Sequence, residues 1–195
     1  CHEHLEYYSL HSLRYLLNRA GLKIINLSFN QINGGSIEVD IAKKKSKYNE
    51  CKELISWVLE SEKMNKYNDI KKHKSFFLEC INHKKLLKKL LVTLKKQNKK
   101  IIGYGASTKG NVLLQFCNID SRLIECIAEV NKYKFNKYTP GSKIKIISEK
   151  AAKIKKPDYM LVLPWHFKDH IIKKENTFLK NGGKLIFPLP DIEII

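Results

Sequence analysis

The spacing of apolar positions divides the chain into three blocks. In the first block, leucines recur at helical spacing over Ser9–Ala20, and Gly21 then suits a helix end. The apolar run Leu22–Phe29 and the alternating segment Ser36–Ile41 predict two strands, and Asn30–Gly35 between them has turn chemistry. A helix and a strand pair are too small to fold independently, so this block is expected to belong to a larger sheet.

The second block, residues 47–99, contains neither proline nor glycine, which favours uninterrupted helices. Helices are predicted over Glu50–Glu60 and Asp69–Lys96. The longer helix has an apolar stripe between lysine-rich faces, so it is expected to pack along one side. The block is interpreted as a helical bridge. The stripe consists of Phe77, Ile81, Leu87, Leu91 and Leu94.

The third block, from residue 100 onward, alternates between strand and helix patterns. Alternation of this kind predicts an α/β fold, with a Rossmann-like, mostly parallel sheet and helices on both faces. The segments expected to form strands are Ile101–Ala106, Leu123–Val130, Tyr159–Leu163 and Lys184–Phe187. The segments expected to form helices are Lys109–Cys117 and His166–Leu179, and Gly182-Gly183 is expected to be a turn.

The net charge of +18 has two possible interpretations. Of 37 basic residues, only Arg14, Arg19 and Arg122 are arginine, whereas nucleic-acid readers usually use arginine for its bidentate, planar donor group. The lysines accompany many Ile, Asn and Tyr residues, as is typical of an AT-rich genome. Solvated lysine faces are therefore favoured. A basic nucleic-acid-binding protein stays as an alternative, and it predicts lysines gathered on one face.

The five cysteines form no C-x-x-C pair, which argues against a zinc ribbon and a disulfide framework. They are interpreted as reduced thiols of a cytosolic protein. There is no secretory signal pattern, and no apolar run approaches the roughly 18 residues of a membrane span. We expect a cytoplasmic protein with no membrane partner. The start at Cys1 instead of Met suggests a fragment or a processed chain.

The glycine-rich turn that begins at Gly103 is the first candidate for ligand binding. Its early glycines permit close backbone approach, and the helix that follows offers N–H groups to an anion. It is not a Walker motif, because Lys109 precedes the last glycine, and its final glycine lies one residue too late for a strict dinucleotide fingerprint. Either the glycines only permit packing, or the turn contacts a phosphate or pyrophosphate, which we favour. The residues expected to bind are Gly103, Gly105, Ser107, Thr108, Lys109 and Asn111.

A second candidate is the run Cys1-His-Glu-His4 at the start of the chain. A carboxylate beside a histidine orients the imidazole and raises its basicity, as a general base requires. The two histidines could instead bind a metal, or all three side chains could be ordinary polar surface residues. The residue types alone do not decide among these alternatives, and without further context the surface interpretation is favoured.

A third candidate is Pro164-Trp-His-Phe167, which directly follows a predicted strand. Ligands of open α/β sheets bind at the carboxyl ends of parallel strands, so Trp165 and His166 are candidates for lining a pocket. Equally, Trp165 and Phe167 could simply cap the core. Tyr138-Thr-Pro-Gly-Ser142 is a turn by composition.

Together these motifs resemble those of sugar C-methyltransferases. The histidine-glutamate-histidine start and Gly34-Gly35-Ser36 resemble the end of that family's methyl-donor domain. The remaining motifs resemble its carboxy-terminal domain, and the match covers nearly the whole chain in the expected order. These motifs are Gly103–Asn111, Tyr138–Gly141, Pro157–Tyr159, Leu163–Phe167, Gly182-Gly183 and Pro188–Pro190.

The resemblance implies an S-adenosylmethionine-dependent enzyme that acts on a thymidine-diphosphate-linked 4-keto-6-deoxy sugar. A base removes the proton next to the keto group, and the enolate then attacks the donor methyl. The family's acid-histidine motif falls on Glu3 and His4, so the resemblance makes His4 the expected base and Glu3 its partner. The family usually has tyrosine where Cys1 stands, so any hydroxyl role there is in doubt.

The resemblance also implies a division of the chain. Residues 1–46 would end an incomplete class I methyltransferase domain, 47–99 would form the helical bridge, and 100–195 the Rossmann-like domain facing the sugar. The main donor site and the family's zinc-binding lobe are expected in amino-terminal domains missing from this chain. The chain alone is therefore expected to be inactive. The competing interpretation is a non-catalytic dinucleotide-binding module in which Glu129, ending the second strand, binds the ribose.

Overall fold

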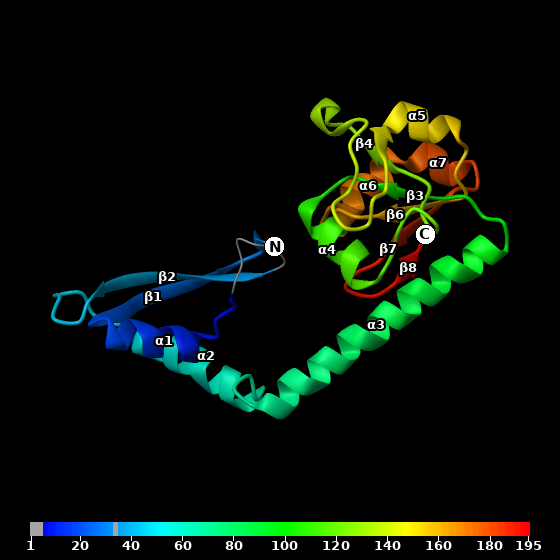
Figure 1. The fold of residues 1–195 in the computed structure, drawn as a ribbon. Helices are drawn as coiled ribbons and strands as arrows, with labels where there is room; N and C mark the ends of the chain where they lie inside the picture. The colour runs from blue at the N-terminus through cyan, green and yellow to red at the C-terminus, as the bar shows by residue number, and fades with distance from the viewer. Residues whose placement is uncertain (1–5, 33–34) are drawn as a thin grey trace. The chain divides into compact units, whose positions relative to one another are not determined.

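The computed structural model describes residues 6–32 and 35–195, which form two compact units (Figure 1). The N-terminal unit extends to Leu78, and the C-terminal unit spans Glu79–Ile195. Helix α3 (Ile70–Lys96) begins in the first unit and continues into the second. Among the described residues, no helix has the length and apolar character required to span a membrane.

The N-terminal unit consists of a strand pair and short helices, as the apolar pattern predicts. Helix α1 (Leu10–Arg19) leads into the antiparallel pair of β1 (Leu22–Asn30) and β2 (Ser36–Lys43), which helix α2 (Lys52–Met64) follows. The small core of this unit is formed by aliphatic side chains from both helices and from β1. These side chains are Leu10, Ile24, Leu27, Ile55 and Val58.

A buried carboxylate joins the two helices of this unit. Glu62 of α2 is 5% exposed, and its oxygens accept the backbone N–H groups of Leu10 at 2.5 Å and His11 at 2.9 Å. These N–H groups at the start of α1 have no partner within the helix, and a negative charge there also suits the helix dipole. Ser9 caps the same helix end by accepting from the N–H of Ser12. Packing and capping therefore fix α1 together.

The C-terminal unit contains a six-stranded sheet in the order β5-β4-β3-β6-β7-β8, and this confirms the predicted fold class. Neighbouring strands are parallel except at β8, which pairs antiparallel with β7 at one edge. The bounds are β3 Ile101–Tyr104, β4 Ile127–Glu129, β5 Ile146–Ser148, β6 Tyr159–Val162, β7 Lys184–Phe187 and β8 Glu193–Ile194.

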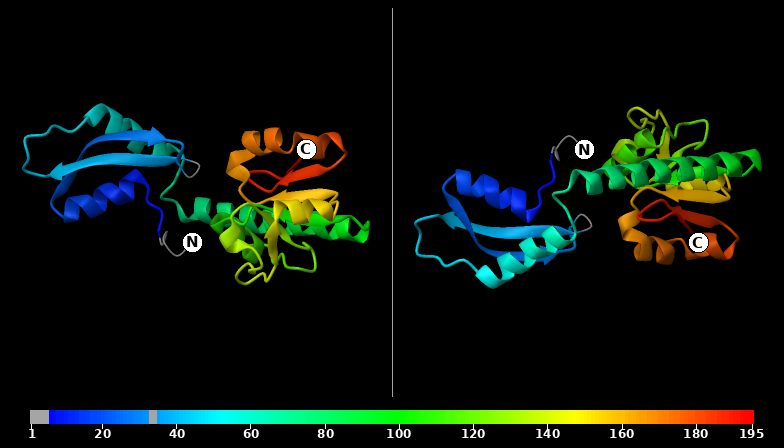
Figure 2. Two further views of the ribbon diagram at one scale, coloured as in Figure 1. Left: turned by 90° about the horizontal axis from the view of Figure 1, so that it is seen from above. Right: turned by 90° about the horizontal axis from the view of Figure 1, so that it is seen from below.

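Helices cover both faces of this sheet (Figure 2). On one face, the C-terminal half of α3 and helix α4 (Thr108–Phe116) pack against the strands through leucines. On the other face lie α5 (Glu149–Ile154), α6 (Lys168–Lys174) and α7 (Asn176–Lys180). The alternation along β3 follows from strand geometry, because successive side chains point to opposite faces. Ile101 accordingly joins the first core cluster, and Ile102 and Tyr104 join the second.

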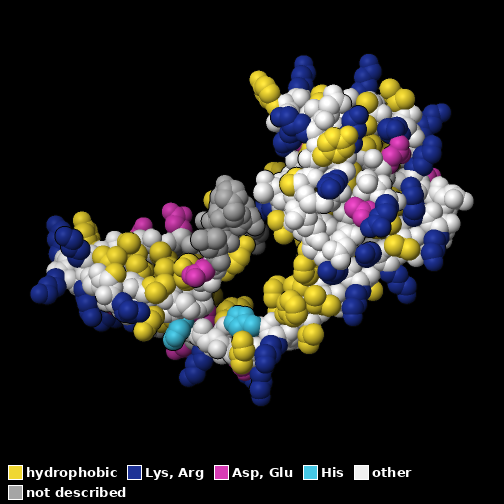
Figure 3. All heavy atoms as spheres, in the orientation of Figure 1, with side chains coloured by type: hydrophobic (Ala, Val, Ile, Leu, Met, Phe, Trp, Pro, Cys, Tyr) yellow, Lys and Arg dark blue, Asp and Glu magenta, His cyan; other side chains and the backbone are white. Residues whose placement is uncertain are grey.

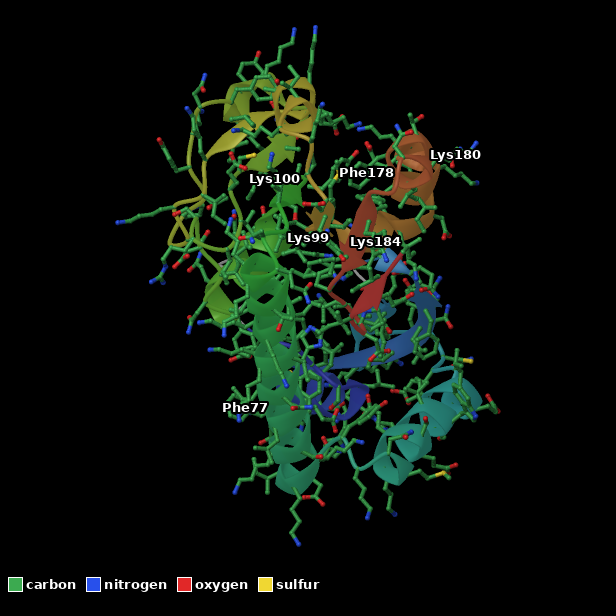
Figure 4. All side chains as sticks on the ribbon, turned by 90° about the vertical axis from the view of Figure 1, so that its right-hand side faces the viewer. Phe77, Lys99, Lys100, Phe178, Lys180 and Lys184 are labelled. Carbon is green, nitrogen blue, oxygen red and sulfur yellow. The ribbon has the colours of Figure 1, made fainter. Side chains whose placement is uncertain are left out.

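The apolar stripe predicted on α3 is confirmed only in part. Leu87, Leu91 and Leu94 are buried in the core of the C-terminal unit, but Phe77 is 59% exposed (Figure 4). The periodicity predicted the helix correctly but could not show where its partner surface ends. The two exposed aromatic neighbours Phe76 and Phe77 therefore lie outside the core that the stripe was expected to form.

The prediction of one helix over His166–Leu179 is wrong. The segment instead contains a short 3-10 turn, Trp165–Phe167, followed by α6 and α7 with Glu175 between them. Glu175 is 1% exposed, and its carboxylate accepts hydrogen bonds from Tyr104 Oη at 2.9 Å and from Lys153 Nζ at 3.0 Å. A buried carboxylate needs such partners, and Glu175 finds them at the residue where α6 ends and α7 begins.

Other boundaries differ because the local pattern was weak. The expected strand Leu123–Val130 is a strand only at β4, since Leu123 and Ile124 close a turn onto Asp120 through their N–H groups. Strand β5, helix α5 and strand β8 were not predicted. In β5 the apolar residues follow a lysine-interrupted stretch, and β8 is two residues long and pairs only with β7.

Candidate functional site

The order of the strands defines one position in the C-terminal unit where a ligand is expected. From β3 the chain adds β4 and β5 on one side of the sheet and then crosses back to add β6 and β7 on the other. The carboxyl ends of β3 and β6 therefore flank the topological switch point, where open α/β sheets bind ligands in a crevice. The glycine-rich turn follows β3 and the Trp165–Phe167 turn follows β6, so two of the three candidate motifs meet here.

Close packing joins these two turns. Gly105 has φ +78°, which favours glycine, and a Cβ built there would lie 2.8 Å from Cγ and Cδ of Pro164. A Cβ on Gly110 would lie 2.6 Å from Cβ of Leu163. A Cβ on Gly103 would lie 2.8 Å from Cγ1 of Ile127. The glycines thus have a packing role, and this role brings the start of α4 against the end of β6.

Ser107 caps α4 in this turn. Its Oγ accepts the N–H of Gly110 at 2.9 Å and donates to the carbonyl of Leu163 at 3.3 Å. A serine at this position satisfies one of the N–H groups that a helix start leaves without a partner. Because its hydroxyl bonds both to α4 and to the end of β6, Ser107 positions the turn. The expectation that it donates directly to a phosphate is not what this geometry favours.

Lys109 and His166 lie within electrostatic range of each other across the switch point. Partial burial and then the positive charge of Lys109 hold the pKa of His166 below its ordinary value. A neutral imidazole at neutral pH is able both to donate and to accept a hydrogen bond. Thr108, at the first position of α4, is exposed. A cation, a neutral imidazole and a helix start are thus contributed by the two turns.

Trp165 and Asn111 show two different environments. Trp165 is partly buried and packs against both core clusters, so it caps the core, and its ring lies edge-on to His166 at 6.1 Å between centroids. The buried Oδ1 of Asn111, in α4, has no hydrogen-bond partner among the described residues. A buried acceptor left in this state costs about 1–3 kcal/mol.

Glu129 is not available to a ribose. It ends β4 and is 7% exposed, and its carboxylate accepts three backbone N–H groups, those of Ala106 at 2.9 Å, Val130 at 2.8 Å and Asn131 at 2.9 Å. Burial alone would raise the pKa of Glu129, but these bonds and the charge of Lys134 lower it below the ordinary value. The ribose role expected from a dinucleotide-binding interpretation is therefore contradicted, because the acid holds the protein's own backbone.

Lys134 completes this arrangement, and the sequence analysis did not single it out. Its Nζ donates to the carbonyl of Ala106 at 2.8 Å and lies 3.6 Å from Oε2 of Glu129. The only signal in the sequence is a lysine five positions after the acid that ends a strand. In a chain with 37 basic residues that signal carries little information, so the contact became visible only in the fold.

The turn Tyr138–Ser142 packs against α4. The Oγ1 of Thr139 lies 2.7 Å from the Oγ of Ser142, and both side chains are buried. A Cβ on Gly141 would lie 2.7 Å from the side chain of Gln115, whose amide donates to the carbonyl of Pro140. These contacts confirm the predicted turn and give it a structural role.

His4, the base that the family resemblance implies, lies outside the described residues, and so do Glu3 and Cys1. Within residues 6–32 and 35–195, no group of three or more His, Cys, Asp or Glu side chains is placed to hold a metal ion. The two strands of the described N-terminal unit are antiparallel, so this part of the chain does not itself contain the carboxyl ends of parallel strands at which open α/β sheets bind nucleotides.

Basic side chains are spread over the visible face of each unit (Figure 3). One group, Lys99, Lys100 and Lys184, lies where β3 and β7 begin, at the edge of the sheet opposite the switch point (Figure 4). Asp158 organises it by accepting from the backbone N–H of Lys100 at 2.7 Å and by pairing with Lys99 at 3.7 Å.

The order and direction of the strands define the C-terminal unit of this chain as a Rossmann-like α/β fold. Residues 31–190 match the family described as the C-methyltransferase C-terminal domain, and the chain belongs to that family. It is 31% identical over 194 residues to the C-methyltransferase NovU of Streptomyces niveus. That match covers 100% of this chain and 46% of the relative, so the chain spans about half of the relative's length. The predicted membership of a C-methyltransferase family is confirmed.

Proposed function

We propose that this chain is the carboxy-terminal part of an S-adenosylmethionine-dependent C-methyltransferase that acts on a nucleotide-linked 4-keto-deoxy sugar of the thymidine-diphosphate type. The reaction proposed is base-assisted formation of an enolate next to the keto group, followed by transfer of a methyl group to carbon. One observation carries the proposal: in a chain of this family, the glycine-rich turn and the Trp165–Phe167 turn meet at the switch point of the sheet.

The C-terminal unit is proposed to hold the diphosphate of the sugar nucleotide. A diphosphate suits the start of α4, because the N–H groups and the dipole of a helix start attract anions. Lys109 adds a positive charge, and His166 is able to donate a hydrogen bond from its neutral form. The close contacts of Gly105 with Pro164 and of Gly110 with Leu163 hold the two turns together, and Gly103 and Asn111 stay proposed contacts on the family resemblance.

The remaining parts of the proposal follow from the family resemblance. His4 is the proposed base and Glu3 its orienting partner, and a positioned base is worth roughly 10²–10⁴-fold in rate. The main S-adenosylmethionine site, and zinc if the parent enzyme uses it, are proposed to lie in amino-terminal domains of the same enzyme. The three-part division at residues 46 and 99 and a cytoplasmic location belong to the same proposal.

A binding measurement tests the proposed role of the C-terminal unit. The chain is titrated with thymidine diphosphate and with thymidine in a calorimeter, and binding of the diphosphate alone is expected. Lys109→Met should weaken that binding, whereas Lys150→Met, at an exposed position of α5, should not. Equal binding of thymidine, or no binding of the diphosphate, would show that the turn does not recognise phosphate.

A further inference from the structure

The Ala106 backbone is held from both of its polar groups by side chains of a single neighbouring segment. The N–H of Ala106 donates to Oε2 of Glu129 at 2.9 Å, and its carbonyl accepts from Nζ of Lys134 at 2.8 Å. Glu129 ends β4, and Lys134 ends the 3-10 turn that follows it. Ala106 is 8% exposed, so neither backbone group could exchange these partners for bulk water without local opening.

This contact is transmitted directly to the start of α4. The carbonyl of Ala106 belongs to the peptide unit that carries the N–H of Ser107, which in turn donates to the carbonyl of Gly105 at 3.0 Å. Ser107 then caps α4 through the N–H of Gly110. Fixing the Ala106 carbonyl therefore fixes the orientation of the capping residue, and with it the direction of the first N–H groups of the helix.

The charges of the pair matter as much as its hydrogen bonds. A buried carboxylate so close to the turn would repel a diphosphate, but Lys134 lies 3.6 Å from it and three N–H groups bond to it. The negative charge is thus compensated within the protein. The carboxylate can then shape the turn without opposing an anionic ligand.

We propose that Glu129 and Lys134 are positioning residues for the diphosphate of the sugar nucleotide: they clamp the Ala106 backbone so that the start of α4 is preformed for phosphate. The inference rests on the proposed function and deepens it. It assigns recognition at this turn to the phosphate groups and withdraws Glu129 from contact with the ribose. A dinucleotide such as NAD, which needs a free acid at the end of the second strand, is then not a ligand of this turn.

The test uses the sign of the change in affinity. Glu129→Gln removes a negative charge near an anion site, so simple electrostatics predicts tighter binding of thymidine diphosphate. The variant keeps an oxygen for Val130 and Asn131 but places an amide NH₂ opposite the N–H of Ala106 and the ammonium of Lys134. Loss of positioning therefore predicts a dissociation constant about fivefold to tenfold higher, as for one lost hydrogen bond.

Matched controls separate charge from position. Glu125→Gln removes a carboxylate ahead of β4, where Glu125 pairs with Lys155 on the surface, and it should change affinity less than about twofold. Lys134→Met should weaken binding, whereas Lys132→Met, in the same 3-10 turn and exposed, should not. The double variant of Glu129 and Lys134 should lose less than the product of the single effects, because both act on one backbone segment.

The outcomes are distinguishable. Affinities are measured with the whole chain at about 10 °C, well below the melting temperature. A variant with a lowered melting temperature is then still folded, so its affinity does not change for that reason alone. If the unaltered chain does not bind thymidine diphosphate, the proposed function itself fails. If the unaltered chain binds thymidine diphosphate, and Glu129→Gln and Lys134→Met bind it equally well or more tightly, only the positioning inference fails. Binding of NAD by the unaltered chain would also contradict the positioning inference. Should Glu129→Gln not fold, the comparison of Lys134→Met with Lys132→Met decides the inference.

Discussion

The packing of α4 against β6 makes Gly110→Ala a sharp test of how the site is built. Helix propensity alone would make this substitution stabilising by about 1 kcal/mol, because alanine is the better helix former. The structure predicts the opposite sign. The new Cβ would lie 2.6 Å from Cβ of Leu163, 2.9 Å from Oγ of Ser107 and 3.2 Å from Cγ of Leu163.

The size of the effect follows from what surrounds the new methyl group. Cβ of Leu163 is attached directly to the backbone, and Leu163 is fully buried directly after β6, a central strand, so it has little freedom to move. Overpacking of this kind costs about 1–3 kcal/mol, and occasionally more. Offsetting about 1 kcal/mol of helix propensity leaves a net destabilisation of roughly 0–2 kcal/mol, with additional loss if the cap of Ser107 is displaced.

Urea unfolding measures this change in the C-terminal unit alone. The chain has two tryptophans, and Trp57, in the N-terminal unit, is 62% exposed. A Trp57→Phe background therefore leaves Trp165 as the fluorescent reporter of the C-terminal unit. Val112→Ala is the matched control, because Val112 lies on the same helix but is 49% exposed and gains similar helix propensity. The packing argument is refuted if Gly110→Ala gains stability by as much as the control does.

Three further changes have expected outcomes. Glu62→Ala should destabilise the N-terminal unit by about 1–3 kcal/mol, because it leaves two N–H groups at the start of α1 without their carboxylate; the exposed Glu60→Ala, followed by Trp57 fluorescence, should not. Tyr104→Phe should cost about 1–2 kcal/mol in urea unfolding, since Glu175 keeps only its lysine partner. Burial, and then Glu175, raise the pKa of Tyr104, so in ultraviolet titration it should stay protonated while exposed tyrosines ionise; ionisation with them would contradict the contact. The pKa of Glu129 is lower in the folded chain than its value of about 4.3 in the unfolded chain, so the ionised carboxylate stabilises the fold at pH values above about 4.3. This stability is lost as the pH falls from about 4.3 through the folded pKa. The melting temperature of Glu129→Gln should therefore change less with pH over this range than that of the unaltered chain.

Local pattern was sufficient where a residue's partners lie close in sequence or where its chemistry is unusual. The glycines around Gly105 predicted the turn after β3, and the alternation in Ser36–Ile41 predicted β2. Both features follow from backbone geometry, which the sequence expresses directly. The meeting of the two turns at the switch point could also be anticipated in outline, because parallel strands place their carboxyl ends at one edge.

Long-range pairing decided the features that the sequence did not predict. Glu175 has the sequence context of an ordinary polar helix residue, and only the fold brings Tyr104 and Lys153, far away in the chain, to its buried carboxylate. Glu129 ends the second strand, where an acid that binds a ribose is expected, but its carboxylate accepts the backbone N–H of Ala106 instead. In both cases the residue type allowed two roles, and only the tertiary contact selected one.

The central claim is that the start of α4, beside the turn after β6, receives the diphosphate of a nucleotide-linked sugar. A crystal structure of the chain with thymidine diphosphate tests this most directly. The account predicts phosphate oxygens within hydrogen-bond distance of the backbone N–H groups of Thr108 or Lys109, on the side of His166. A diphosphate bound instead among Lys99, Lys100 and Lys184 at the opposite edge of the sheet would contradict it.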